Sequence, residues 1–141
     1  MASSDEYHTI HSAVDVENFV SQVPTFHDGV LREMAFLNST FVQPNLSMTG
    51  FGLPTLRILI QTQWAESSAV ELVLEGVLLI NLEFFILTEG DNIIYDSKLT
   101  WAEGHLELEL DGNRIHALSA RWIKRLDWMG DEARFTSWAT Q

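Results

Sequence analysis

The sequence predicts a small, acidic, mainly β domain, an antiparallel sandwich or curled sheet of about seven strands with one short N-terminal helix. Three observations predict this fold. The length of 141 residues suits a single domain. Apolar residues make up 46% of the chain, which is enough for a hydrophobic core. From residue 56 to residue 125, apolar and polar residues tend to alternate in closely spaced segments that leave no room for crossover helices.

The predicted helix lies near the N-terminus. Residues 1–14 are polar and are expected to form a flexible tail, and residues 15–141 are expected to form the β-rich domain. The apolar residues that recur at helical spacing are Val16, Phe19, Val20 and Val23. Asp15 suits the N-cap of this helix, and Pro24 suits its end.

The strands follow the helix. They are predicted over residues 30–37, 56–64, 70–75, 77–87, 93–101, 105–110 and 114–128. Residues 38–54 contain two prolines and two glycines and are expected to form a long irregular connection. Gly76 predicts a bulge or bend between two strands. Asp111 and Gly112 form the strongest turn signal, that of a two-residue hairpin.

The formal net charge of −12 restricts the classes of partner. It argues against nucleic-acid binding, because a phosphate backbone requires clustered Lys and Arg. Residues 66–111 hold eleven acidic residues and one basic residue, whereas residues 112–125 hold four basic residues and no acidic one. Such a field speeds encounter with a basic protein, although the same charge also serves solubility alone.

The composition also bears on the compartment. The chain has no cysteine, which excludes disulfides and thiolate metal sites and suits the reducing cytoplasm. No apolar run approaches the roughly 18–20 residues that span a bilayer. The first residues lack the basic and apolar regions of a signal peptide. We therefore expect a cytoplasmic protein that does not contact a membrane.

No motif of a catalytic or cofactor-binding site is recognisable. The sequence lacks cysteine and the Gly-x-Ser-x-Gly nucleophile motif. The glycine-rich residues 50–54 lack the lysine of a phosphate-binding loop. No catalytic residue, cofactor or metal ion is therefore predicted, and the balance favours a protein without enzymatic activity.

The histidines are the first candidates for chemistry, but their spacing favours structural roles. His8 and His11 have a metal-ligand spacing and lack a third ligand. His27 and Asp28 could form an acid–base pair or a turn. The turn is favoured, because adjacent side chains of an extended chain point to opposite faces.

A second pair of histidines flanks the predicted hairpin turn. His105 lies six residues before the turn and His116 four residues after it, so the two are offset rather than opposite. Together with Glu107 they could form a weak metal site, which the sequence does not favour.

The candidate binding site is an acidic sheet face. Glutamates alternate with core-facing residues and should therefore point outward, with an aromatic residue at the margin. The predicted partner-binding residues are Glu71, Glu75, Glu83, Trp101, Glu107 and Glu109. The alternative is an ordinary solvated sheet face.

Several short motifs resemble one known family. The motifs are Phe26-His27-Asp28, the segment from Val70 to Val77, the segment from Asn81 to Phe85, and Ile115-His116-Ala117. They are similar to motifs of small bacterial β-rich immunity proteins of polymorphic toxin systems, the immunity protein 50 type. The resemblance covers about residues 24–125, and Val23-Pro24-Thr25 replaces the family's Trp-Pro entry. It implies a protein that binds and blocks a toxin.

Two functions remain open at this point. The first is an interaction protein that resembles an antitoxin or immunity protein and blocks a basic toxin. The second is a small-ligand-binding β domain or enzyme with a pocket near His27 and His105, in which Trp101 could take part. A homodimer formed through an edge strand is compatible with both.

Overall fold

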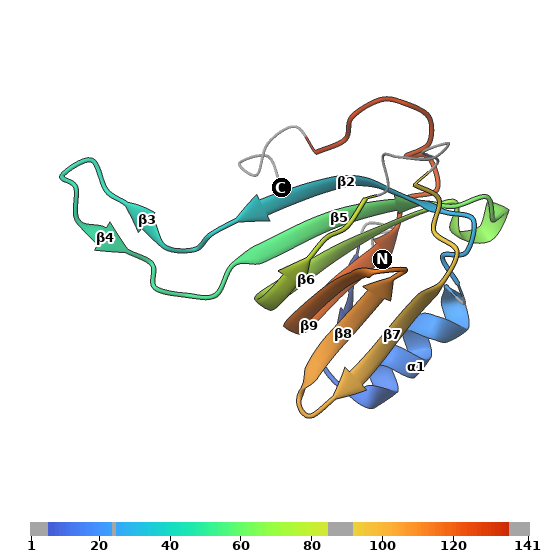
Figure 1. Ribbon diagram of the computed structural model, residues 1–141, viewed down its shortest axis with the longest axis horizontal. Coiled ribbons are helices and arrows are strands. Elements are labelled where there is room, and N and C mark those ends of the chain that lie inside the picture. The colour runs from blue at the N-terminus through green and yellow to red at the C-terminus, as the bar shows by residue number, and fades with distance from the viewer. Residues whose placement is uncertain (1–5, 24, 85–91, 136–141) are drawn as a thin grey trace.

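The structure is a computed structural model that describes residues 6–23, 25–84 and 92–135. Its elements in chain order are β1 (His8–Ile10), α1 (Ala13–Gln22), β2 (Val30–Leu37), β3 (Phe41–Val42), β4 (Met48–Thr49), β5 (Thr55–Gln61), a 3₁₀ turn (Ala65–Ser67), β6 (Ala69–Asn81), β7 (Ser97–Ala102), β8 (His105–Leu110) and β9 (Asn113–Lys124). Seven strands form one antiparallel sheet, in the order β2-β5-β6-β9-β8-β7, with β1 paired to β9. The sheet is curled and does not close on itself, and α1 lies across one of its faces (Figure 1). The predicted mainly β fold is confirmed, in the form of a curled sheet.

The hydrophobic core fills the space between α1 and the sheet. Alternate residues of the central strands point into it, among them Ile58, Leu72 and Trp122. Phe19 of α1 packs edge-on against Trp122, with 5.0 Å between the ring centroids. The face with α1 is called the helix face below, and the opposite face is called the outer face.

The helix begins slightly earlier than the sequence predicts. Ser12, rather than Asp15, is the N-cap, and its hydroxyl accepts a hydrogen bond from the Asp15 backbone N–H at 3.2 Å. The Asp15 carboxylate in turn accepts from the backbone N–H of His11 at 3.0 Å. The first contact gives a partner to one of the backbone N–H groups left free at the start of the helix, and the second gives a partner to the N–H of the residue before the N-cap. Among the described residues, no helix has the length and apolar character needed to cross a bilayer.

The structure differs from the predicted flexible tail over residues 1–14. His8–Ile10 form β1, which pairs with β9 opposite residues 120–122. β8 pairs only with the first half of β9, so the second half offers unpaired backbone groups that β1 satisfies. His8 also stacks on Trp122 at 4.5 Å. Residues 1–5 lie outside the described residues.

The two strands predicted around Gly76 are one long strand, β6. Gly76 has a φ of +66°, and the pairing register with β9 shifts between Val77 and Leu79. The predicted bulge is therefore confirmed, and it bends β6 without ending it. β6 ends at Asn81, earlier than predicted, and residues 85–91 lie outside the described part of the chain.

The Asp111–Gly112 turn joins β8 to β9 as predicted. Leu110 pairs with Asn113, and Asp111 has a left-handed φ of +56°. The Asp111 carboxylate accepts hydrogen bonds from the backbone N–H groups of Tyr95 and Asp96. The turn thereby fixes the segment that leads into β7.

Candidate functional site

A buried ionic cluster occupies the outer face of the sheet. Glu71 on β6 is fully buried, and its carboxylate accepts hydrogen bonds from Arg57 Nε at 2.5 Å and Arg125 Nε at 3.0 Å. The Tyr7 hydroxyl donates to the same carboxylate at 3.0 Å. Arg57 comes from β5, which pairs with β6 over this region. One carboxylate thus lies between two guanidinium groups.

The C-terminal segment covers this cluster. The Arg57 guanidinium lies 4.0 Å from the centre of the Phe135 ring, and the Arg125 guanidinium lies 4.5 Å from the centre of the Trp128 ring. The Glu33 carboxylate accepts from the backbone N–H groups of Arg134 and Phe135. Residues 126–135 therefore pack onto the outer face. Trp138, the other C-terminal tryptophan, lies outside the described residues.

The cluster shifts the pKa of Tyr7 and of Arg125. Burial raises the pKa of the Tyr7 phenol, and the charge and hydrogen-bond acceptance of Glu71 add to the effect. Burial opposes the charge of Arg125, but its hydrogen bond to Glu71 and the charge of that carboxylate outweigh this, so the pKa of Arg125 is raised. The neutral phenol is the form that the folded state favours.

We expect this shift to be visible in a pH titration of the Tyr95→Phe variant, in which Tyr7 is the only tyrosine. The phenolate absorbance should rise with a midpoint above the ordinary pKa of about 10. The neutral phenol stabilises the fold fully below the pKa of the unfolded state, and this contribution is lost as the pH rises through the higher folded pKa. Adding Glu71→Gln should move the midpoint down, since it removes the negative charge. A midpoint that does not change would contradict the assignment.

The predicted acidic face does not form as expected. Glu71 is buried and paired with two arginines, and Glu75 pairs with Arg121 at 2.9 Å. Glu109 is exposed on β8, where its register partners are the basic residues Lys98 and Arg114. The glutamates lie on the face that the alternation predicts, but basic residues from neighbouring strands lie beside them. The outer face carries mixed charge.

Glu83 and Trp101 also lie elsewhere than predicted. Glu83 follows the end of β6 and lies beside the Asp111–Gly112 turn, where its backbone N–H donates to the side-chain oxygen of Asn113. Trp101 packs against the hydrophobic core on the helix face, opposite the face that carries Glu107. Trp101 is therefore on the opposite face of the sheet from the predicted glutamates of β6 and β8, and Glu83 lies beyond the end of β6.

The turn that the sequence favours at His27–Asp28 is present, and it brings the two side chains together instead of directing them to opposite faces. Asp28 has a left-handed φ of +64°, which turns the chain, and His27 Nε2 lies 3.4 Å from its carboxylate. His27 Nδ1 lies 2.6 Å from the carbonyl oxygen of Tyr95, so this nitrogen carries the proton of that hydrogen bond. The pair is exposed, and His105 lies among other neighbours on β8.

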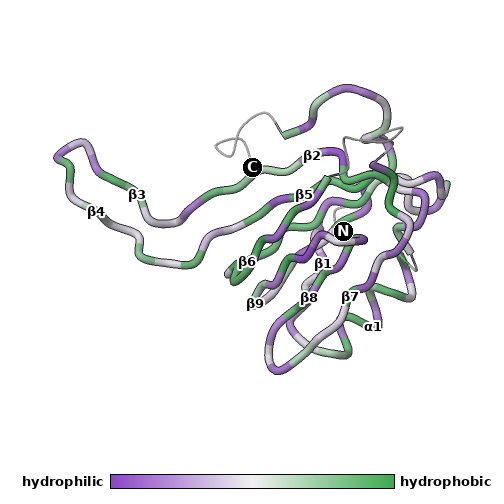
Figure 2. The backbone as a smooth tube through the Cα atoms, in the orientation of Figure 1, coloured by the Kyte–Doolittle hydropathy of each residue, from purple (hydrophilic) through white to green (hydrophobic). Residues whose placement is uncertain are grey.

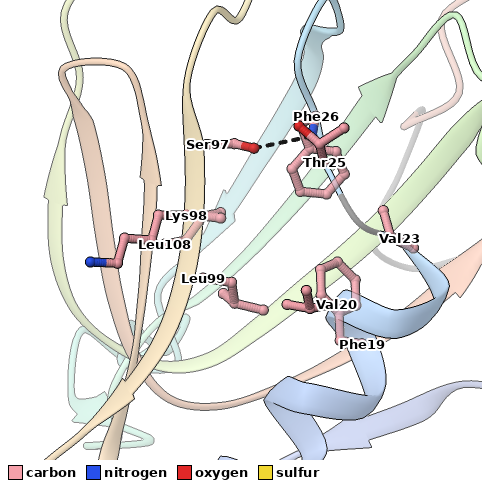
Figure 3. A pocket seen from close by; sticks show the side chains of 9 residues that line it. All are labelled: Phe19, Val20, Val23, Thr25, Phe26, Ser97, Lys98, Leu99 and Leu108. Carbon is pink, nitrogen blue, oxygen red and sulfur yellow. Dashed lines mark hydrogen bonds between the residues drawn. The ribbon is translucent and has the colours of Figure 1, made fainter.

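A small apolar cavity of about 190 Å³ lies between α1 and β7 (Figure 3). Its walls include Phe19, Val23 and Leu99, and at one end the Ser97 hydroxyl accepts a hydrogen bond from the Phe26 backbone N–H at 3.0 Å. Sites for drug-sized ligands are usually about 300–1,000 Å³. The cavity is below that range, and neither His27 nor His105 lines it.

A projecting hairpin that the sequence analysis did not predict extends from β2 and β5, and we call it the arm (residues 36–54). Instead of an irregular connection, residues 38–54 contain the paired strands β3 and β4. The arm extends away from the rest of the sheet (Figure 1). Its turn is closed by a hydrogen bond from Gln43 N–H to the Ser47 carbonyl at 2.8 Å.

The surface of the arm is unusually apolar. Hydrophobic residues line both of its strands, and polar residues gather at the turn (Figure 2). Its exposed large apolar residues are Phe36, Leu37, Phe41, Val42, Leu46, Met48, Phe51 and Leu53. Leu46 is 83% exposed and Phe51 is 76% exposed. No charged residue occurs between Glu33 and Arg57.

The arm has a defined backbone. Gly50 has a φ of +100°, and a Cβ atom at this position would lie 2.0 Å from the carbonyl oxygen of Ser39. The two strands of the arm therefore approach each other there more closely than a side chain permits. The Ser39 hydroxyl also donates to the Leu53 carbonyl. The apolar side chains are thus presented on a fixed hairpin.

Comparison with protein-family models, curated proteins and solved structures gives no match for this chain. The candidate site therefore depends on the structure alone. The lack of charge in residues 34–56 was readable from the sequence and is the signal that could have identified the arm.

The remaining histidines separate into two groups. His8 stacks on Trp122, and His11 Nδ1 lies 2.7 Å from the Asp15 carboxylate, so each has its own partner. His105 and His116, by contrast, lie beside each other on β8 and β9, with 5.3 Å between their ring centroids. The predicted offset between them is confirmed by the strand register, and it brings them together diagonally.

Proposed function

We propose that this chain is a non-enzymatic protein-binding domain that docks onto a basic protein through its arm. The observation that carries the proposal is the arm, an ordered hairpin with eight large exposed apolar residues and no charge. Natural β proteins commonly protect exposed edges with charged residues, which the arm lacks, because unprotected apolar edges associate. Contiguous exposed apolar patches mark interaction surfaces.

The net charge favours a basic partner over a second copy of the chain. Two copies that each carry a charge of −12 repel each other, whereas a basic protein is attracted and oriented. The arm itself can enter an apolar groove without any charged group losing its hydration. The arm would therefore supply the buried contact, and the acidic body would supply the attraction.

The resemblance to immunity proteins suggests the class of this partner. A bacterial immunity protein binds and blocks a cognate toxin, and we propose a basic toxin as the partner. The absence of cysteine suits a complex that forms in the reducing cytoplasm.

The experiment combines the chain with the purified protein encoded by the neighbouring gene and measures the dissociation constant. The triple variant Phe41→Ser, Leu46→Ser, Phe51→Ser should weaken binding by about a hundredfold or more, because each lost apolar contact is worth on the order of 1 kcal/mol or more. The melting temperature should change little, because these side chains are exposed. Raising the salt concentration should slow association.

A matched control replaces exposed apolar residues outside the arm, with Val14→Ser and Leu126→Ser. Wild-type affinity in this control would support the arm, whereas an equal loss in both variants would contradict it. No binding by the neighbouring protein would overturn the toxin assignment. A wild-type dimer that the arm variant converts to a monomer would show that the arm binds a second copy instead.

A further inference from the structure

A three-residue cluster on the outer face lies apart from both the arm and the buried ionic cluster. It consists of His105 and Glu107 on β8 and His116 on β9. His105 and Glu107 are two positions apart on one strand and therefore share a face. His116 is the register partner of Glu107 on β9. The two-residue turn at Asp111–Gly112 fixes this register.

The distances within the cluster suit one ion. His105 Nε2 lies 3.6 Å and His116 Nε2 lies 3.9 Å from the same Glu107 oxygen, Oε1. One ligand atom from each of the three residues can be chosen so that all lie within 4.8 Å of one another. A tetrahedral zinc ion with bonds of about 2.0–2.1 Å holds its ligand atoms roughly 3.3–3.4 Å apart. Small side-chain rotations would therefore bring the three atoms onto one ion.

The surroundings also favour a metal ligand set over an ordinary ion pair. Glu71 and Glu75 are paired with arginines, whereas the described ion-pair partners of Glu107 are the two imidazoles. The three side chains are 22–25% exposed. Neighbouring side chains therefore restrict their positions, and an ion from solvent can still reach them. Two histidines and one carboxylate form a known zinc ligand set that leaves a fourth position open.

We propose that His105, Glu107 and His116 bind a divalent transition metal ion, with Zn²⁺ as the preferred ion. Imidazole ligands select late first-row metals over Mg²⁺ and Ca²⁺, which prefer all-oxygen sites. The three protein ligands leave a position for water or for a donor group from another molecule. The site lies on strands β8 and β9, so the ion also joins the two strands of that hairpin.

The test is isothermal titration calorimetry of the full chain with Zn²⁺ after removal of bound metal by a chelator. The expected result is one ion per chain, and excess Mg²⁺ should not displace it. His105→Ala, His116→Ala and Glu107→Gln should each weaken Zn²⁺ binding by more than about tenfold. Even the loss of a residue that only hydrogen-bonds to a metal ligand typically lowers metal affinity by that amount. Co²⁺ bound to the wild-type protein should give visible absorption bands, and these bands should be lost in the three variants.

His11→Ala is the matched control, because His11 is also a histidine paired with a carboxylate but lacks a third ligand. It should bind Zn²⁺ like the wild type. Circular dichroism without metal checks that the three variants fold, which is expected because none of these residues is buried in the core. Three results would overturn the proposal: no Zn²⁺ binding by the wild type, a loss of Zn²⁺ binding in His11→Ala alone, or an affinity for Mg²⁺ equal to that for Zn²⁺.

Discussion

Replacing Glu71 by alanine is expected to lower the free energy of unfolding by about 3–5 kcal/mol. The Glu71 carboxylate is the buried counter-charge of Arg57, whose side chain is only 4% exposed. Without it, the Arg57 guanidinium remains in the protein interior and loses its ion-pair partner among the described residues, and Arg125 loses the same partner. Urea denaturation followed by tryptophan fluorescence measures the effect as a lower midpoint.

Two further variants test the reason for this loss. Glu75→Ala removes a glutamate from the same strand and face, but its partner Arg121 and Glu75 itself are both more than 40% exposed. Its cost should be about 0–1 kcal/mol. The double variant Arg57→Met, Glu71→Leu replaces the most deeply buried pair with apolar groups but still leaves Arg125, which is 17% exposed, without its carboxylate, so it should recover part of the lost stability. If Glu71→Ala were as stable as Glu75→Ala, the buried ionic cluster would not hold the outer face together.

The alternation of residues predicted which face a strand residue occupies, but not what covers that face. Glu71 does lie opposite the core, as its alternation with Val70 and Leu72 indicated. Its environment depends on Arg57 of β5 and on the C-terminal segment, which lie 14 or more residues away in sequence. The alternation of apolar and polar residues within one strand does not reveal which distant strand or C-terminal segment will pack against it. The predicted acidic face therefore became a mixture of buried and paired charges.

The arm and β1 were missed for a different reason. β3 and β4 have two residues each, too few to show an alternating pattern, and they lie among prolines and glycines that suggest irregular structure. β1 is a strand of only three residues. It is stabilised by backbone pairing with β9 and by the stacking of His8 on the Trp122 ring. Strands with a clear pattern were located correctly, with errors at their ends: the predicted strand over residues 30–37 coincides with β2 (Val30–Leu37), whereas the one predicted over residues 114–128 is β9 (Asn113–Lys124).

Replacing Trp122 by alanine is the second change with a large expected effect, a loss of about 3–5 kcal/mol in the free energy of unfolding. Trp122 is 2% exposed and connects three elements. It lies on β9, stacks against His8 of β1, and meets the Phe19 ring of α1 at 85°. Truncation leaves a cavity beneath the helix and removes both ring contacts, so α1 and β1 should loosen before the rest of the sheet.

Hydrogen exchange distinguishes this local effect from general destabilisation. In Trp122→Ala, amides of β1 and α1 should exchange faster than those of β5 and β6, which are paired in the centre of the sheet. Trp64→Ala is the matched control, because Trp64 is 51% exposed and should cost less than about 1 kcal/mol. If the alanine variant does not fold, Trp122→Phe keeps a ring and should show the same order of exchange with a smaller loss. Equal acceleration throughout the sheet would mean that Trp122 stabilises the whole domain rather than the attachment of its N-terminal elements.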